Sequence, residues 1–195
     1  LRKFEKGLIL PKYDDDTKTI VFLGRLVERK GCMELLRAVQ YLERTKKFSN
    51  RRLLLCGAGP LELKIQKYID DHNLHNLVEC TGKISEQEKP DYLASADLAV
   101  FPSKSGESFG IVLVEAIASG ARVTLGGDNP GYRYVLGGRE EVIVNPRNTP
   151  QLANKIDGLL SHEKESLRLG EQQRKDIRQF DVDTVGAQIV DVYSS

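Results

Sequence analysis

Residues 97–125 read DLAVFPSKSGESFGIVLVEAIASGARVTL, and they contain two short apolar runs on either side of a longer apolar stretch. The runs at 97–101 and 121–125 have the composition and length of buried strands. The stretch 111–118 between them holds a single polar residue, Glu115, which suggests a helix buried nearly all round. A buried carboxylate would need a partner, from the protein or from a ligand. Strand, helix and strand in this order are typical of a parallel sheet.

Short apolar runs alternate with helical patterns along most of the chain. Further strands are expected at 19–23, 52–56, 77–80 and 141–144, and further helices at 31–46, 61–71 and 86–95. This alternation predicts one α/β domain from residue 18 to residue 195, a Rossmann-like parallel sheet with helices on both faces. We expect a polar lead-in or linker at 1–17, and helical structure from about residue 149, in segments at 152–160, 164–179 and 182–193.

Length and composition narrow the class of protein. The 195 residues suffice for one core, and 40% hydrophobic and 29% charged residues are ordinary for a globular domain. A net charge of +1 gives no electrostatic footprint for nucleic acid. No apolar run approaches the ~18 residues of a membrane span, so we expect no transmembrane segment, no signal peptide and a cytoplasmic location. The chain begins at Leu1 rather than Met, which suggests a piece of a longer protein.

Cysteines and histidines indicate neither a metal site nor a catalytic relay. The cysteines are odd in number and widely spaced, and we expect buried free thiols in a reducing compartment at Cys32, Cys56 and Cys80. The histidines stand in polar surroundings away from residues 105–120 and are expected at the surface, at His72, His75 and His162.

The segment 107–115 combines two carboxylates with the start of a helix. Glu107 stands just before the helix, and Glu115 lies eight residues on, which is ~12 Å along a helix axis. Between them the free backbone N–H groups at the helix start form an anion site, at Ser108, Phe109, Gly110 and Ile111. A nucleoside diphosphate sugar has the matching order of sugar hydroxyls, diphosphate and ribose hydroxyls. Alternatively, the two glutamates cap the helix and pair with a core arginine, although capping explains Glu107 better than Glu115.

The first strand is followed by GRLVERKG at 24–31, where two cations suit a diphosphate. Arg25 follows Gly24 at the ligand edge of the sheet, and Lys30 stands just before the next helix. The alternative is a solvated charged loop, and Arg29 is interpreted as a solvated neighbour. Residues 57–60, GAGP, lack the third glycine of a dinucleotide fingerprint and are predicted to form a tight turn.

The stretch GESFGIVLVEAIASG resembles the Glu-x7-Glu signature of the retaining glycosyltransferases of family four, which have the GT-B fold. Within this stretch, the sequence GESFGIVLVE is especially similar to that of the phosphatidylinositol mannosyltransferases. The resemblance implies that the chain is the C-terminal, donor-binding half of such an enzyme. It also implies that Glu107 holds the donor sugar, that Arg25 and Lys30 neutralise the diphosphate, and that Glu115 holds the ribose. The final stretch, FDVDTVGAQIVDVY, resembles the last helix of the family.

The loop TGKISE at 81–86 resembles the loop of the family that receives the nucleobase around Ile84. In the mannosyltransferases an acidic residue and a lysine at this spacing contact guanine, which would be Glu86 and Lys89. The alternative is that Ser85 caps a helix whose first turn carries ordinary charges. The sequence therefore does not decide the identity of the nucleobase, and GDP-linked and UDP-linked donors are both candidates.

The activity implied is transfer of a hexose, with GDP-mannose as one candidate donor, to a lipid or glycan hydroxyl. No cofactor and no metal are required, because the cations and the helix dipole supply the positive charge. The acceptor, and any association with a membrane, would depend on an N-terminal half that is missing here, so this chain should bind donor but turn over poorly. The alternatives are a standalone nucleotide-sugar binding or regulatory module, and a phosphorylase or epimerase. Two positions depart from the family pattern, Arg122 in place of a usual proline and Glu141 in place of a usual glycine.

Overall fold

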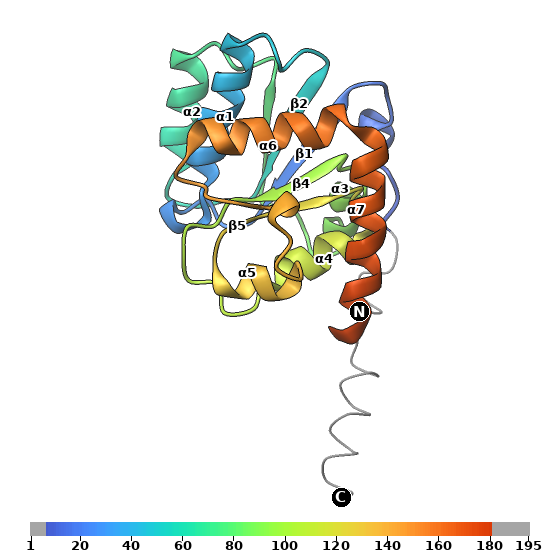
Figure 1. The fold of residues 1–195 in the computed structure, drawn as a ribbon. Coiled ribbons are helices and arrows are strands. Elements are labelled where there is room, and N and C mark those ends of the chain that lie inside the picture. Colours follow the sequence, from blue (N-terminus) through green and yellow to red (C-terminus); the bar gives the residue numbers. More distant parts are fainter. Residues whose placement is uncertain (1–6, 181–195) are drawn as a thin grey trace, which may run out of the picture.

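A computed structural model of the chain describes residues 7–180 and shows one six-stranded parallel sheet (Figure 1). The strands are β1 (Lys18–Leu23), β2 (Arg51–Cys56), β3 (Val78–Gly82), β4 (Leu98–Phe101), β5 (Thr124–Gly127) and β6 (Ile143–Val144). Their order is β3-β2-β1-β4-β5-β6, and every neighbouring pair is parallel. This doubly wound order confirms the predicted Rossmann-like sheet, with its switch point between β1 and β4.

Helices cover both faces of the sheet (Figure 1). They are α1 (Cys32–Arg44), α2 (Glu62–Asp71), α3 (Lys89–Ala94), α4 (Ile111–Ser119), α5 (Pro130–Val135), α6 (Thr149–Ser161) and α7 (Glu163–Asp176). Helix α6 packs on α1, α3 packs on α4, and α7 contacts both α4 and α6. No helix within residues 7–180 is long and apolar enough to cross a bilayer. The predicted segment 182–193, and all of FDVDTVGAQIVDVY after Phe180, lie outside the described residues.

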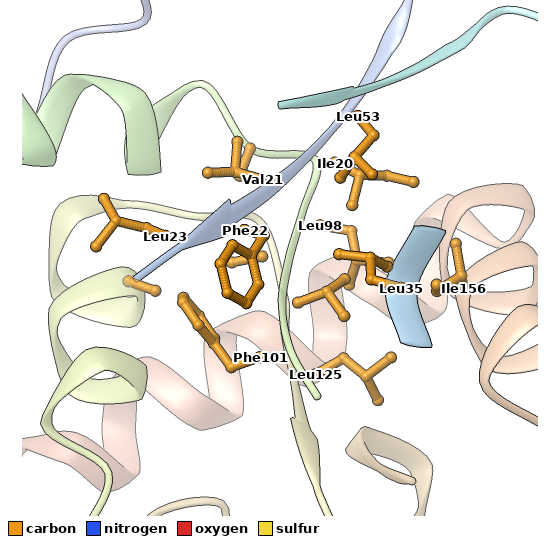
Figure 2. Packing of buried hydrophobic residues seen from close by; sticks show 14 of the residues in the cluster. Ile20, Val21, Phe22, Leu23, Leu35, Leu53, Leu98, Phe101, Leu125 and Ile156 are labelled. Atoms are coloured by element: carbon orange, nitrogen blue, oxygen red, sulfur yellow. The ribbon is translucent and has the colours of Figure 1, made fainter. Parts of the chain in front are cut away.

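The core lies along the central strands, whose side chains are buried on both faces. Figure 2 shows Ile20 of β1 pointing towards Leu35 of α1 and Ile156 of α6, whereas Val21 and Leu23 point to the other side of the sheet. Successive strand residues alternate between faces, so a strand covered by helices on both sides must be apolar throughout. This requirement explains why TIVFL and LAVF were readable as strands from the sequence.

Several element boundaries differ from the prediction. No helix is predicted between 125 and 141, but Pro130 begins helix α5, because the Asn129 side chain accepts a hydrogen bond from the Tyr132 N–H at 3.0 Å and caps it. Helix α3 begins at Lys89 rather than at residue 86. Strand β5 begins at Thr124 rather than at 121.

The lead-in is irregular apart from a 3₁₀ turn at Pro11–Tyr13, yet its described part packs on the sheet domain. Tyr13 is buried, and its hydroxyl donates to Glu79 Oε1 at 2.9 Å. The Leu10 N–H donates to Ser95 Oγ at 2.9 Å. The division of the chain at residue 17 stays a prediction.

All three cysteines are free thiols, and two of them, Cys32 and Cys56, are buried. Cys80 is exposed, which corrects the expectation of three buried thiols. It lies on the edge strand β3, where little covers the outer side of the sheet. Burial raises the pKa of Cys32 to about 11 and that of Cys56 to about 12.

These pKa values predict a slow reaction of two thiols and a loss of stability in alkali. At pH 8, we expect Ellman's reagent to modify Cys80 promptly, and Cys32 and Cys56 only when the protein unfolds. The unfolded chain loses the two buried thiol protons above the ordinary thiol pKa, whereas the folded chain keeps them. The free energy of unfolding should therefore fall as the pH rises from 9 towards 11 to 12. The control is Cys80→Ser, which should show no prompt reaction. Prompt reaction of all three thiols in the folded protein would contradict the prediction.

Candidate functional site

Two adjoining cavities lie at the carboxyl ends of β1, β2 and β4. The motif cavity, about 350 Å³, is lined by the stretch 106–112 together with Lys30 and Glu115. The loop cavity, about 260 Å³, is lined by residues of the 56–58 and 83–86 loops and by Lys89. The two cavities share Leu23, Gly24, Arg25 and Lys89. Every site residue predicted from the sequence lines one cavity or the other.

A larger cavity of about 520 Å³ lies between α1, α2 and the start of α6. It contains none of the predicted site residues and lies away from the carboxyl ends of the strands. Ligands of doubly wound sheets bind at those ends, so chemistry rather than size selects the smaller pair of cavities.

Close contact between two loops holds Arg25 at the junction of the cavities. A Cβ on Gly57 would lie 1.9 Å from the Gly24 carbonyl oxygen, and the Leu26 N–H donates to the Ala58 oxygen at 3.0 Å. The turn lies slightly later than the predicted 57–60, at 59–62, where the Glu62 N–H donates to the Gly59 carbonyl oxygen at 3.1 Å and α2 begins. Arg25 is exposed, and its guanidinium makes no hydrogen bond or ion pair with any residue between 7 and 180. An unpaired cation therefore stands where both cavities open.

The two carboxylate oxygens of Glu107 differ in their hydrogen bonding. Its side chain is 11% exposed, and Oε1 accepts from Lys30 Nζ at 2.6 Å, Ser103 Oγ at 2.8 Å and Arg29 Nη1 at 3.1 Å. Across the described part of the chain, Oε2 has no hydrogen-bond partner. The carboxylate is held from one side and offers its second oxygen as an acceptor.

Arg29 was interpreted as a solvated neighbour, and this was wrong. Its side chain is 51% exposed, yet Nη1 bonds both Glu107 and the Gly106 carbonyl oxygen, the latter at 3.3 Å. The 3₁₀ turn Glu28–Lys30 and the left-handed Gly31 bring both cations under the motif loop. These partners lie almost 80 residues apart in the sequence, so no local pattern could reveal the contact.

Ser103, Asn129 and Tyr132 are buried polar residues that the sequence reasoning missed. Asn129 Nδ2 donates to the Ser103 carbonyl oxygen at 3.4 Å and to the Gly127 carbonyl oxygen at 3.2 Å. Burial and the charge of Glu107 raise the pKa of the Tyr132 phenol, and a hydrogen bond with Ser103 opposes this rise. The pair Pro102-Ser103 directly after β4 was the available signal, because a polar residue there lies at the ligand edge of the sheet.

The start of α4 provides the predicted backbone donors. Gly110 has a left-handed φ of 95° and precedes the first helical residue, Ile111. None of the N–H groups of residues 108–111 donates to a protein acceptor within the described chain, and all four residues line the motif cavity. Unpaired N–H groups at a helix N-terminus favour an anion.

Glu115 is half-buried rather than fully buried, because α4 is open on one side. Ile111, one turn earlier, is 65% exposed. The premise of a helix buried all round was therefore wrong, although Glu115 does line the motif cavity, as predicted for a ligand-facing residue.

In the loop cavity, the structure supports the interpretation of Ser85 as a cap, and the nucleobase role of Ile84, Glu86 and Lys89 stays a prediction. Ser85 caps the turn reciprocally with Glu88, since the Ser85 N–H donates to Glu88 Oε2 at 2.9 Å and the Glu88 N–H donates to Ser85 Oγ at 3.3 Å. Glu86 and Lys89 pair with each other at 2.5 Å and line the cavity together with Ile84. A carboxylate and an amine thus stand where the nucleobase was predicted.

Other residues singled out in the sequence lie away from the cavities. The three histidines are exposed, as predicted. Arg122 bridges Asp97 at 2.8 Å and Glu163 at 3.0 Å, which ties the amino end of β4 to α7. Glu141 is exposed in a 3₁₀ turn. Within residues 7–180, no cluster of three histidine, cysteine or acidic side chains is arranged to hold a metal ion.

Comparison with known proteins gives the family. Residues 10–176 match the sequence profile of the family described as Glycosyl transferases group 1. A phosphatidyl-myo-inositol mannosyltransferase of Mycolicibacterium smegmatis is 33% identical over 196 residues, covering 98% of this chain and 49% of that protein. A GDP-mannose-dependent alpha-(1-6)-phosphatidylinositol monomannoside mannosyltransferase of Mycobacterium tuberculosis is 28% identical, covering 89% of this chain and 46% of that protein. The chain spans about half the length of the curated relatives it matches.

Comparison with solved structures shows the same fold in other proteins. Anabaena HepE in complex with UDP and glucose has a TM-score of 0.81 at 19% identity, covering 99% of this chain and 54% of that one, which shows likeness of fold. The catalytic domain of cholesterol-alpha-glucosyltransferase from Helicobacter pylori has a TM-score of 0.72 at 25% identity, covering 84% of this chain and 99% of that one. The resemblance predicted from GESFGIVLVE is confirmed, and the chain belongs to the group 1 glycosyl transferases.

Proposed function

We propose that this chain is the donor-binding half of a retaining glycosyltransferase, and that the two cavities together hold one nucleoside diphosphate sugar. The observation that carries the proposal is the row of groups along the motif cavity. An open carboxylate oxygen on Glu107, unpaired N–H groups at the start of α4, and Glu115 follow one another as a sugar, a diphosphate and a ribose do.

The diphosphate would lie between Arg25, Lys30 and the start of α4. Arg25 has no partner in the described chain, and an arginine can bind two phosphate oxygens at once. Lys30 donates one of its three N–H groups to Glu107, and the other two can donate to phosphate oxygens. Negative charge grows on the diphosphate as the bond to the sugar breaks, and preorganised cations and N–H groups stabilise it without a metal.

The base would lie in the loop cavity and be guanine. Glu86 can accept the two N–H donors on one edge of guanine, whereas uracil offers a single N–H there. The relative from Mycobacterium tuberculosis is named as GDP-mannose-dependent, which supports GDP-mannose as the donor. The acceptor would be a lipid or glycan hydroxyl that the other half of the complete enzyme brings.

Calorimetric titration of the chain with GDP, UDP, ADP and GDP-mannose tests this proposal. We expect GDP and GDP-mannose to bind more tightly than UDP and ADP. Arg25→Ala and Glu115→Ala should each weaken that binding by about tenfold, since each removes one hydrogen-bonding charged group. The control variants are Arg168→Ala and Glu165→Ala, which break an exposed ion pair on α7. Each should change nucleotide binding by less than twofold. Absence of binding by any nucleotide would contradict the proposal.

A standalone binding or regulatory module is the second candidate, because the described residues form one sheet domain that holds both cavities. The two candidates differ in whether this half needs a partner half to act. We expect the isolated chain to release GDP from GDP-mannose very slowly, because the acceptor and further catalytic groups are missing. Coupled assay of released GDP measures this rate. Rapid sugar transfer by this chain alone would contradict our assignment of it as a donor-binding half.

A further inference from the structure

Ion pairs join the segment after β1 and the loop after β4 in both directions. From the first side, Arg29 and Lys30 donate to Glu107. From the second side, Lys104 Nζ donates to Glu34 Oε1 at 2.9 Å, and Glu34 lies in the first turn of α1. Each side therefore supplies a cation to a carboxylate on the other.

The pair of Lys104 and Glu34 is largely shielded from solvent. Glu34 is 8% exposed, and the Lys104 side chain is 16% exposed. Arg37 Nη1 also approaches Glu34 Oε1, but at 3.4 Å, so Lys104 makes the shorter of these contacts. Across residues 7–180, Glu34 Oε2 is buried without a hydrogen-bond partner. Removal of Lys104 alone would leave a buried carboxylate poorly compensated.

Backbone contacts beside this pair fix one alignment of the two segments. The Lys104 N–H donates to the Arg29 carbonyl oxygen at 2.7 Å, and Arg29 Nη1 donates to the Gly106 carbonyl oxygen at 3.3 Å. A shift of the loop by one residue would therefore move Lys104 away from Glu34 and Glu107 away from its cations. A buried ion resists such a shift more than an apolar side chain does, because away from its partner it is neither paired nor hydrated.

We propose that Lys104 and Glu34 are positioning residues, which hold the loop after β4 in the register that places the Glu107 carboxylate beside Lys30 and towards the donor sugar. The inference rests on the proposed function, because it takes Glu107 as the residue that contacts the sugar. Neither Lys104 nor Glu34 lines either cavity, so their effect on the donor is indirect. Arg25 lies outside the loop after β4, so a shift of that loop should affect the sugar more than the nucleotide.

The first measurement separates stability of the fold from the charge of the pair. Lys104→Met leaves Glu34 buried without its closest cation and should lower the midpoint of thermal unfolding. The double variant Lys104→Met with Glu34→Met replaces the ion pair by two apolar side chains of similar length. Its midpoint should return to that of the unaltered chain or exceed it, because a buried ion pair replaced as a whole costs little stability.

The second measurement separates binding of the sugar from binding of the nucleotide. Dissociation constants are measured by calorimetry for GDP, GDP-mannose, UDP and UDP-glucose, and the sugar contribution is the ratio of the bare nucleotide's constant to that of its sugar form. In the stable double variant, the constant for the bare nucleotide should stay within twofold. The sugar contribution should fall by about fivefold, as expected for the loss of one hydrogen bond to the sugar.

The matched control is Lys67→Met with Asp71→Met, which removes an exposed lysine–carboxylate pair of 3.1 Å on α2. This control should leave the sugar contribution unchanged, because an exposed pair contributes little and these residues lie outside both loops.

Several outcomes would contradict the positioning role. A double variant that is stable and keeps the full sugar contribution would overturn the inference, because the pair would then support only the fold. A double variant less stable than Lys104→Met would overturn it too, because the charges would then be needed for folding itself. Equal losses for bare and sugar-linked nucleotides, or a ratio near one in the unaltered chain, would have the same effect. Failure of the unaltered chain to bind any bare nucleotide would overturn the proposed function instead.

Discussion

Lys30→Met is expected to weaken GDP-mannose binding by about 10- to 100-fold, which is the loss of hydrogen bonds from one charged group. Lys30 Nζ lies 2.6 Å from Glu107 Oε1, and its side chain is only 20% exposed. Methionine keeps the length of the side chain and removes the charge, so phosphate loses a cation and Glu107 loses its shortest contact. The expected effect exceeds that of Arg25→Ala, because two parts of the donor depend on Lys30.

The matched control is Lys64→Met, since Lys64 pairs with Glu28 at 2.9 Å on an exposed surface. Calorimetry with GDP and GDP-mannose, together with thermal unfolding, would measure both variants. We expect Lys64→Met to bind normally, because exposed ion pairs contribute little. Binding by Lys30→Met within threefold of the unaltered chain would show that the donor does not contact this lysine.

Gly31→Ala is expected to lower the free energy of unfolding by about 3 kcal/mol or more. Gly31 has a left-handed φ of 75°, and a Cβ there would lie 1.9 Å from the Pro102 carbonyl oxygen. An alanine must therefore force apart the loops after β1 and β4. Because Lys30 precedes this glycine and Ser103 follows Pro102, the same movement should separate Lys30 from Glu107 and weaken donor binding.

Gly158→Ala provides the opposite control. Gly158 lies within α6, and a Cβ there would have no neighbour within 4 Å, so alanine should stabilise the helix by up to ~1 kcal/mol. Urea unfolding of both variants gives the comparison. A Gly31→Ala loss below ~1 kcal/mol would mean that the two loops can part without cost.

The strands and the central motif were predictable because their signals are local. Runs such as TIVFL must be apolar in a sheet buried on both faces, and the spacing of Glu107 and Glu115 is contained in one segment. Helix α5 carried local signals too, an asparagine cap at Asn129 and a proline in the first turn at Pro130. Asn-Pro-Gly is equally typical of a turn, so the sequence alone does not distinguish a turn from a helix here.

The partners of Glu107 were not predictable, because they depend on tertiary contacts. Arg29 reaches this carboxylate across almost 80 residues of sequence, through loops that meet at Gly31 and Pro102. Ser103 was concealed for another reason, since a serine after a strand more often caps a turn than supports a carboxylate. The half-burial of Glu115 depends on an opening beside α4 that an apolar helix pattern does not reveal.

The contact between Lys30 and Glu107 has a consequence for the order of events after reaction. In the proposed placement, one ammonium group serves both the sugar-facing carboxylate and the departing diphosphate, so the two ends of the donor are thermodynamically coupled through it. Once the sugar has been passed on, Glu107 loses a hydroxyl partner and competes more strongly for the lysine. The departing diphosphate gains negative charge at the same moment, so in this placement the carboxylate and the diphosphate would compete for one ammonium group after transfer.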